Sequence, residues 1–269
     1  MRIEKVYKEI FIFVAGTTPQ IITETICALS QKTIPIYPDE IFIITTLTGK
    51  RFIEKQLLDS GILSEMMLEL GLPQIPITEG SFVVPKGANN FEIDDIRSEE
   101  ENELMGNLIT SLVRDKSNDP SSRLHCSIAG GRKTMSFYLG AALQLFGRPQ
   151  DKLYHVLVTP EFELNPSFFY KPKKNRIIQG RGIDGKPKQL NTKNANIELA
   201  ELPFIRLSGK ISFQGKDFRE LVLEGQRTID LAMVQPELVV NLLERYIQIG
   251  DTIIEMLPIQ LMFYTAFLR

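Results

Sequence analysis

A pair of glycines followed by two cations is the chemically most suggestive stretch of the sequence, Ser127-Ile-Ala-Gly-Gly-Arg-Lys-Thr-Met135. An apolar strand is expected before it and an apolar helix after it. Glycines let the backbone approach a ligand closely, and a helix start presents unpaired N–H groups at the positive end of its dipole. Arg132 and Lys133 add two charges. The stretch predicts an anion site, most simply for a phosphate. It is not a P-loop, because the Walker spacing before Gly-Lys-Ser/Thr is absent.

Further polar loops are expected at the same edge of the sheet. In an open parallel sheet, ligands bind beyond the carboxyl ends of the strands, where the strand order switches. Gly16-Thr-Thr-Pro-Gln20, Thr45-Thr-Leu-Thr-Gly-Lys50 and Thr159-Pro-Glu161 each leave such a strand end. Their hydroxyls, amide and cations suit a phosphate and a ribose. The candidate ligand-binding residues are Gly16, Thr17, Thr18, Gln20, Thr46, Thr48, Lys50, Gly130, Gly131, Arg132, Lys133 and Thr134.

Taken one at a time, these residues have simpler interpretations. Two glycines after a strand can serve only a tight turn, and Thr17 or Thr18 can be only a helix cap. Lys50 and Arg51 can be solvated residues of a first helical turn. The functional hypothesis therefore depends on the expectation that all these loops leave one edge of the sheet.

The sequence gives little support to metal or cofactor chemistry. Its two histidines, His125 and His155, each lie in an apolar strand pattern, and no His/Cys/Asp group has ligand spacing. Arg148 and His155 match the Arg-x4–6-His spacing of HEPN ribonucleases, but that motif belongs on a helix and His155 lies in an expected strand. A GxGxxG fingerprint is absent, which disfavours a dinucleotide. No metal and no cofactor are expected.

Alternating strand and helix patterns predict an α/β domain over residues 1–160. Such alternation is typical of a mostly parallel, Rossmann-like sheet flanked by helices. The expected strands are 9–15, 40–46, 75–77, 124–128 and 152–159. The expected helices begin near Pro19, where Thr18 can cap, and cover 50–70, 94–113 and 133–146, with a loop over 78–95.

Residues 161–269 are expected to form a smaller α+β extension. Gly182-Ile-Asp-Gly185 is a hairpin signal, and 204–207 and 218–232 are the expected strand and helix. A second hairpin joins 239–243 to 246–249, and an apolar helix follows Leu257. This last part resembles the start of a winged-helix unit. The helix runs to Arg269 without a stop signal, which suggests either docking on a partner or a chain cut at that point.

Composition narrows the class of protein. With 43% hydrophobic and 24% charged residues, the 269-residue chain has an ordinary globular composition. A net charge of −2 argues against broad electrostatic capture of nucleic acid. No transmembrane run or signal peptide is expected. Cys27 and Cys126 lie in apolar segments, where buried thiols are expected, so a reducing, cytoplasmic location is predicted.

The two principal loops together resemble a known family. Gly16-Thr-Thr-Pro-Gln-Ile-Ile-Thr-Glu-Thr25 and Ser127-Ile-Ala-Gly-Gly-Arg-Lys-Thr-Met135 are similar to the loops of CARF (CRISPR-associated Rossmann fold) proteins of type III CRISPR systems. The greatest similarity is to the CRISPR-associated ring nucleases. It extends into Leu202-Pro-Phe-Ile-Arg-Leu207 and Leu257-Pro-Ile-Gln-Leu-Met-Phe-Tyr264, and so covers most of the chain.

This resemblance implies a homodimer whose strand-end loops form one two-fold pocket for cyclic oligoadenylate, most often cyclic tetra-adenylate. It implies metal-independent cleavage, in which a ribose 2′-OH attacks the adjacent phosphate and leaves a 2′,3′-cyclic phosphate. Such a reaction depends on in-line positioning and charge stabilisation. By analogy, Lys133 and Arg132 neutralise the phosphate, and Thr17, Thr18 or Gln20 orients the ribose or phosphate. The catalytic candidates are Lys133, Arg132 and Thr18.

Three alternatives stay open at this point. The chain could sense the ring without cleaving it, as a DNA-binding transcription regulator or as the sensory part of a truncated effector. It could also be a nucleotide-binding enzyme unrelated to CRISPR, which would keep the strand-end loops but lose the two-fold pocket.

Overall fold

The computed structural model describes residues 7–74, 77–163, 165–182, 186–233 and 237–267. Within these residues, six strands form one sheet in the order β3-β2-β1-β4-β5-β8. Five of them are parallel, and β8 runs antiparallel to β5 at the edge. The strands are β1 (Lys8–Val14), β2 (Glu40–Ile44), β3 (Phe82–Val83), β4 (Ser122–Ser127), β5 (Lys152–Val158) and β8 (Ile197–Leu202). The predicted α/β fold class is confirmed.

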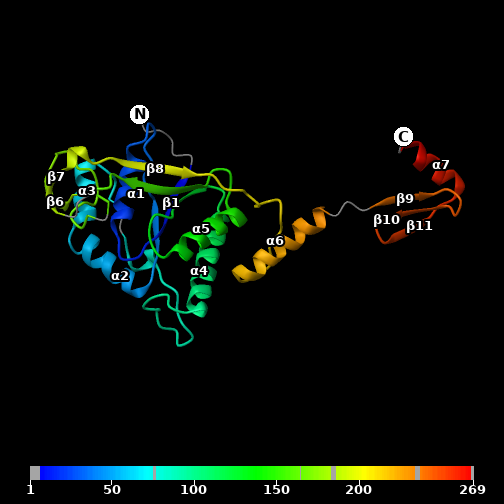
Figure 1. The fold of residues 1–269 in the computed structure, drawn as a ribbon, viewed down its shortest axis with the longest axis horizontal. Helices are drawn as coiled ribbons and strands as arrows, with labels where there is room; N and C mark the ends of the chain where they lie inside the picture. The colour runs from blue at the N-terminus through cyan, green and yellow to red at the C-terminus, as the bar shows by residue number, and fades with distance from the viewer. Residues whose placement is uncertain (1–6, 75–76, 164, 183–185, 234–236, 268–269) are drawn as a thin grey trace. The chain divides into compact units, whose positions relative to one another are not determined.

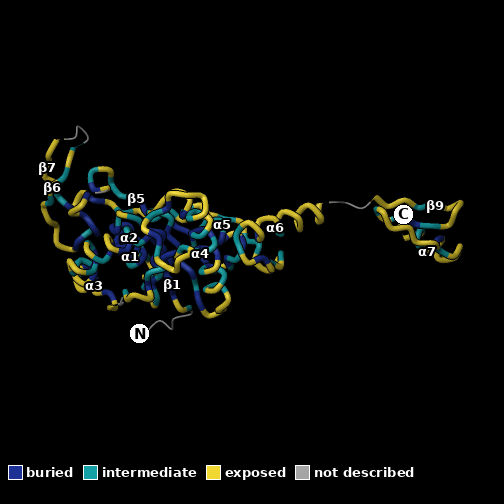
Figure 2. The backbone as a smooth tube through the Cα atoms, turned by 90° about the horizontal axis from the view of Figure 1, so that it is seen from below, coloured by how far each residue is buried: buried dark blue, intermediate teal, exposed yellow. Residues whose placement is uncertain are grey.

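Both faces of the sheet are covered by helices, as an uninterrupted apolar strand requires. Phe11 and Phe13 of β1 pack in one apolar cluster with side chains of α1 (Gln20–Ser30) and α3 (Ile62–Leu70). Ile10, Ile12 and Val14 alternate to the other face, where α4 (Glu99–Ser117) and α5 (Lys133–Phe146) cover them. Figure 1 shows α1 and α5 on either side of β1. In Figure 2, most of the buried residues belong to this layer of sheet and helices.

Several expected boundaries move in the structure. The helix expected over 50–70 is present as α2 (Leu47–Ile53), which continues into a π-helical turn (Glu54–Leu58), and as α3. Gly61, with a left-handed φ of 75°, separates the turn from α3. The helix expected from 94 begins at Glu99, since Ser98 and Glu101 form a capping box there. The loop over 78–95 contains a 3₁₀ turn (Glu79–Ser81) and β3.

The region after β5 differs most from the expectation. The strand predicted over 204–207 is wrong; the strand is β8, at Ile197–Leu202, and it pairs with β5 beyond the expected boundary at residue 160. The first hairpin is present as β6 (Ile177–Arg181) and β7 (Pro187–Asn191). Its turn residues 183–185 and the expected strand residues 75–76 lie outside the described part of the chain.

The chain divides into two compact units. The first runs to Ser212 and includes 216–218, and the second comprises 213–215 and continues from Arg219. The elements after Ser212 are α6 (Phe218–Met233), the antiparallel strands β9 (Leu238–Asn241), β10 (Tyr246–Ile249) and β11 (Thr252–Glu255), and α7 (Pro258–Phe267). The predicted second hairpin is therefore present, with β11 as an added strand. Among the described helices, none has the length and apolar character needed to cross a membrane.

Candidate functional site

A cavity of about 370 Å³ lies at the carboxyl edge of the sheet. It opens where the strand order reverses between β1 and β4, the position at which open α/β sheets bind ligands. Loops after β1, β2 and β4 contribute to it, together with β5 and the segment before α4. Its lining includes nine predicted residues: Gly16, Thr17, Thr18, Gln20, Thr46, Thr48, Gly130, Gly131 and Arg132. The convergence expected of the loops after β1, β2 and β4 is therefore observed, whereas Thr159-Pro-Glu161 of the fourth loop does not line the cavity.

The loop after β1 contributes two threonines to the cavity lining. Helix α1 begins at Gln20, Pro19 takes the N-cap position, and no side chain caps the helix. The cap considered for Thr17 or Thr18 is thus absent. Both threonines line the cavity instead. Gln20 is 5% exposed, and its Oε1 has no hydrogen-bond partner among the described residues.

Glycines are needed where the first and third loops approach each other. A Cβ on Gly130 would lie 2.9 Å from the carbonyl oxygen of Val14. Gly131 has a φ of 74°, and its Cβ would lie 3.0 Å from Sδ of Met135. Any side chain here would push the two loops apart. The glycine pair therefore holds the start of α5 close to the end of β1.

Arg132 lies at the N-cap of α5 and is held by an acidic neighbour. Its Nε donates to Oδ1 of Asp95 at 3.0 Å and its Nη2 donates to Oδ2 at 2.5 Å. This pairing lowers the pKa of the Asp95 carboxyl. Asp95 also lines the cavity, and its only signal in the sequence is its place in a polar loop. The ion pair fixes the guanidinium at the cavity wall but offsets its charge.

Three predicted ligand-binding residues lie outside the lining. The Lys50 ammonium pairs with the carboxylates of Glu79 and Glu92, and its side chain is buried there. Lys133 and Thr134 are exposed in the first turn of α5. Thr46 lines the cavity, but its hydroxyl also accepts a hydrogen bond from the Gly49 amide and so caps α2. The expected group of three cations is not assembled within one chain.

Acidic residues that were not predicted also line the cavity, so the cavity is more acidic than expected. Glu24 follows Gln20 by one helical turn, so the spacing of four could have identified it. It is 4% exposed and lines the cavity with Glu163 and His155. Burial raises the pKa of the Glu24 carboxyl to about 8, and the charge of Glu163 adds to the effect. At neutral pH, Glu24 is therefore mostly an uncharged carboxylic acid.

The two histidines have different surroundings. His125 is buried within β4 among Phe11, Glu9 and Tyr154 and does not line the cavity. His155 is partly exposed and faces the cavity from β5. In the described part of the chain, no group of three or more His, Cys, Asp or Glu side chains is arranged to hold a metal ion.

A protein-family model matches this chain. It is described as CRISPR-associated protein NE0113, and it matches residues 18–230, well over half of the sequence. The chain belongs to this family. The match extends over the loops after β2 and β4 and over Gln20 and Glu24. No curated protein matches the sequence of this NE0113-family member.

Proposed function

We propose that this NE0113-family protein is a CARF-type receptor for cyclic oligoadenylate, most specifically cyclic tetra-adenylate, and a ring nuclease that linearises it. In this role the protein switches off type III CRISPR signalling. The observation that carries the proposal is the cavity at the switch point of a Rossmann-like sheet, formed by the Gly16 and Gly130-Gly131 loops, in a CRISPR-associated protein.

The local geometry supports a reaction that depends on positioning. The amides of Lys133 and Thr134 open α5 and have no hydrogen-bond partner among the described residues. Such amides suit a phosphate oxygen. The Arg132 guanidinium lies at the same helix start, and Thr17 and Thr18 line the same cavity from the loop after β1, which approaches this loop at Gly16 and Gly131. In the proposed step, the ribose 2′-oxygen bonds to phosphorus as the bond to the 5′-oxygen breaks. The 2′-OH proton is lost and the 5′-oxygen gains one, leaving a 2′,3′-cyclic phosphate and a 5′-OH.

One observation favours a second candidate, a sensor that binds the ring without cleaving it. Among the described residues that line the cavity, Arg132 is the only Lys or Arg, and it is already paired with Asp95. A paired cation stabilises the negative charge of a phosphorane less than an unpaired one does. A DNA-binding regulator is one form of this sensor.

Incubation of the protein with labelled cyclic tetra-adenylate in the presence of EDTA tests the proposal. Linear products that end in a 2′,3′-cyclic phosphate support the ring nuclease. Tight binding without turnover supports the sensor, and a DNA shift assay then tests the regulator. Lys133→Ala is the decisive variant for the site. If both binding and cleavage persist unchanged in it, the role given to Lys133 is wrong.

A further inference from the structure

Gln20 and Glu24 lie one helical turn apart on α1, and Oε1 of the first and the carboxyl of the second lack hydrogen bonds to the described residues. The two residues are 5% and 4% exposed, and both line the cavity. Buried polar groups are nearly always hydrogen-bonded. A buried amide oxygen without a partner, next to a carboxyl without a hydrogen bond in the same cavity, fits a ligand that supplies both partners.

The hydrogen-bonding character of the pair selects the chemistry of that ligand. At neutral pH the Glu24 carboxyl is mostly uncharged, because burial and Glu163 raise its pKa to about 8. A carboxylic acid and an amide each offer one acceptor oxygen and at least one donor hydrogen. The negative charge of Glu163 nearby disfavours a phosphate beside this pair. The pair suits a neutral group that carries donors and acceptors side by side.

Part of the cavity wall is apolar. Ile21, Met135, Val156 and Val158 line it with aliphatic and thioether side chains. Flat heterocycles pack well on such surfaces, and an adenine edge places an exocyclic amine between two ring nitrogens that accept hydrogen bonds. A glutamine amide pairs with this edge by two hydrogen bonds. An added O–H donor from Glu24 meets the ring nitrogen that remains.

We propose that Gln20 and Glu24 form an adenine subsite inside the cavity, in which Glu24 is an uncharged hydrogen-bond donor to the base. The inference rests on the proposed function, because the cyclic oligoadenylate provides the base. It divides the site into two parts. The base enters the interior beside α1, while the phosphates stay at the outer loops of Gly16 and Gly130.

The subsite makes ligand affinity depend on pH. Ionisation of Glu24 removes its O–H donor, so affinity is full below a pH of about 8 and falls as the pH rises above it. Other titratable or charged groups face the cavity from the elements packed around α1. Those that line the cavity are Glu163 after β5, His155 on β5, Asp95 before α4 and Arg132 at the start of α5. On α1 itself, Cys27 is the next titratable residue after Glu24.

Equilibrium binding of two probes, cyclic tetra-adenylate and adenosine 5′-monophosphate, tests this subsite between about pH 7 and pH 9.5. We expect wild-type affinity to fall about tenfold over this range, as the protonated fraction falls. Glu24→Gln should bind at a level independent of pH, because an amide donates without ionising. Glu24→Leu should bind about tenfold more weakly even at pH 7. Glu163→Gln should shift the fall in affinity to lower pH. Glu198→Gln, on β8 and outside the lining, is the matched control and should behave as wild type.

The outcomes separate the subsite from the proposed function. Ring binding that is independent of pH in the wild type and unchanged in Glu24→Leu overturns the subsite and leaves the function standing. Binding of the monophosphate with the expected pH profile, but no binding of the ring, supports the subsite and overturns the function. If neither probe binds, both are wrong. A thermal melt of each variant checks that it is folded.

Discussion

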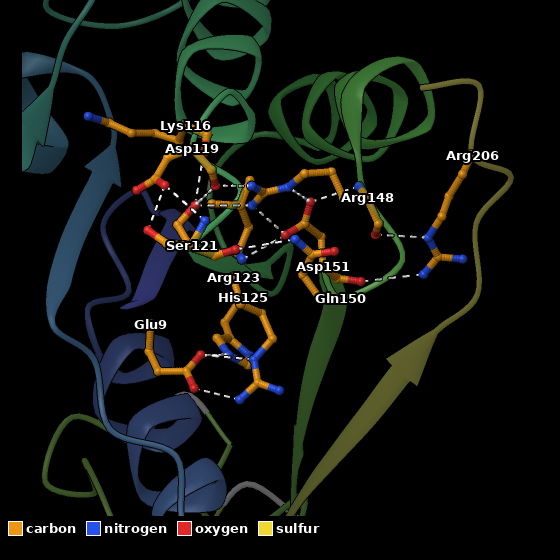
Figure 3. A network of polar contacts seen from close by, with 12 residues as sticks. Glu9, Lys116, Asp119, Ser121, Arg123, His125, Arg148, Gln150, Asp151 and Arg206 are labelled. Atoms are coloured by element: carbon orange, nitrogen blue, oxygen red, sulfur yellow. Dashed lines mark hydrogen bonds and ion pairs between the residues drawn. The ribbon is translucent and has the colours of Figure 1, made fainter. Parts of the chain in front are cut away.

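Two buried glutamates show how the same residue type takes opposite charge states in this fold. Glu9 on β1 pairs with Arg123 at 2.5 and 2.9 Å and accepts from Nε2 of His125 at 2.8 Å (Figure 3). Burial opposes ionisation of Glu9, but these bonds outweigh it, and its pKa is lowered. Glu24 has no such donors, and its pKa is raised. The Glu9 cluster therefore stabilises the amino-terminal end of the sheet, while Glu24 stays available to a ligand.

Replacement of Glu24 by Gln should stabilise the protein in a pH-dependent manner. The folded state holds the Glu24 proton up to a pH of about 8, whereas the unfolded chain releases it near 4.5. Wild-type stability therefore falls as pH rises between these values. Since one pH unit corresponds to about 1.4 kcal/mol, the upper bound of the effect is about 5 kcal/mol. Denaturant unfolding of Glu24→Gln should show its largest gain above pH 8 and almost none near pH 4.5. A gain of equal size at both would contradict a protonated Glu24.

Replacement of Arg132 by Gln tests the single Lys or Arg in the described cavity lining. A charge-assisted contact to a phosphate contributes about 1.5–3 kcal/mol, so we expect cyclic tetra-adenylate to bind about tenfold or more weakly. Arg97→Gln is the matched control, because Arg97 also contacts Asp95, at 3.5 Å, but lies outside that lining. Fluorescence titration measures both variants. Equal losses in the two would place the effect in the Asp95 loop rather than in the ligand contact.

At the level of elements, the loops after β1 and β4 leave very little room for side chains where they approach each other. Gly130→Ala would bring a Cβ to 2.9 Å from a backbone carbonyl, whereas Gly16→Ala would meet its nearest neighbour at an ordinary 3.5 Å. We expect Gly130→Ala to lose about 1–3 kcal/mol of stability through overpacking, and Gly16→Ala to lose far less. Chemical denaturation checks the difference. Similar losses in both would mean that the loops separate easily.

The elements that the sequence predicted well are those whose pattern is local. Helix α5 begins at Lys133 as expected, because the glycine pair marks its start. The division of the expected helix at Gly61 was missed, since the apolar spacing continues across that residue. Strand β8 was missed because it is a half-exposed edge strand that pairs with β5 only through the tertiary fold. The cavity loops followed from strand ends, whereas Asp95 and Glu163 enter from loops whose path depends on the whole sheet.

At the level of the whole molecule, the size of the cavity argues for two chains in each complex. A cavity of about 370 Å³ is at the lower end of the roughly 300–1,000 Å³ that holds one drug-sized ligand. A ring of four nucleotides is several times larger than such a ligand. On the proposed function, one chain therefore has room for a single nucleotide, and the proposed two-fold pair of chains would surround the ring. In that pair, the exposed Lys133 of each chain lies beside its own cavity, at the start of α5, where it can reach a shared ligand.

Calorimetric titration with cyclic tetra-adenylate should therefore give one ring per two chains, and sedimentation at micromolar concentration should give a dimer. Adenosine 5′-monophosphate should instead bind once per chain, since it requires only one cavity. Lys133→Ala should weaken binding of the ring by more than it weakens binding of the monophosphate, because the outer phosphates are present only in the ring. A monomer that binds one ring per chain would contradict the shared pocket while leaving the adenine subsite of each chain intact.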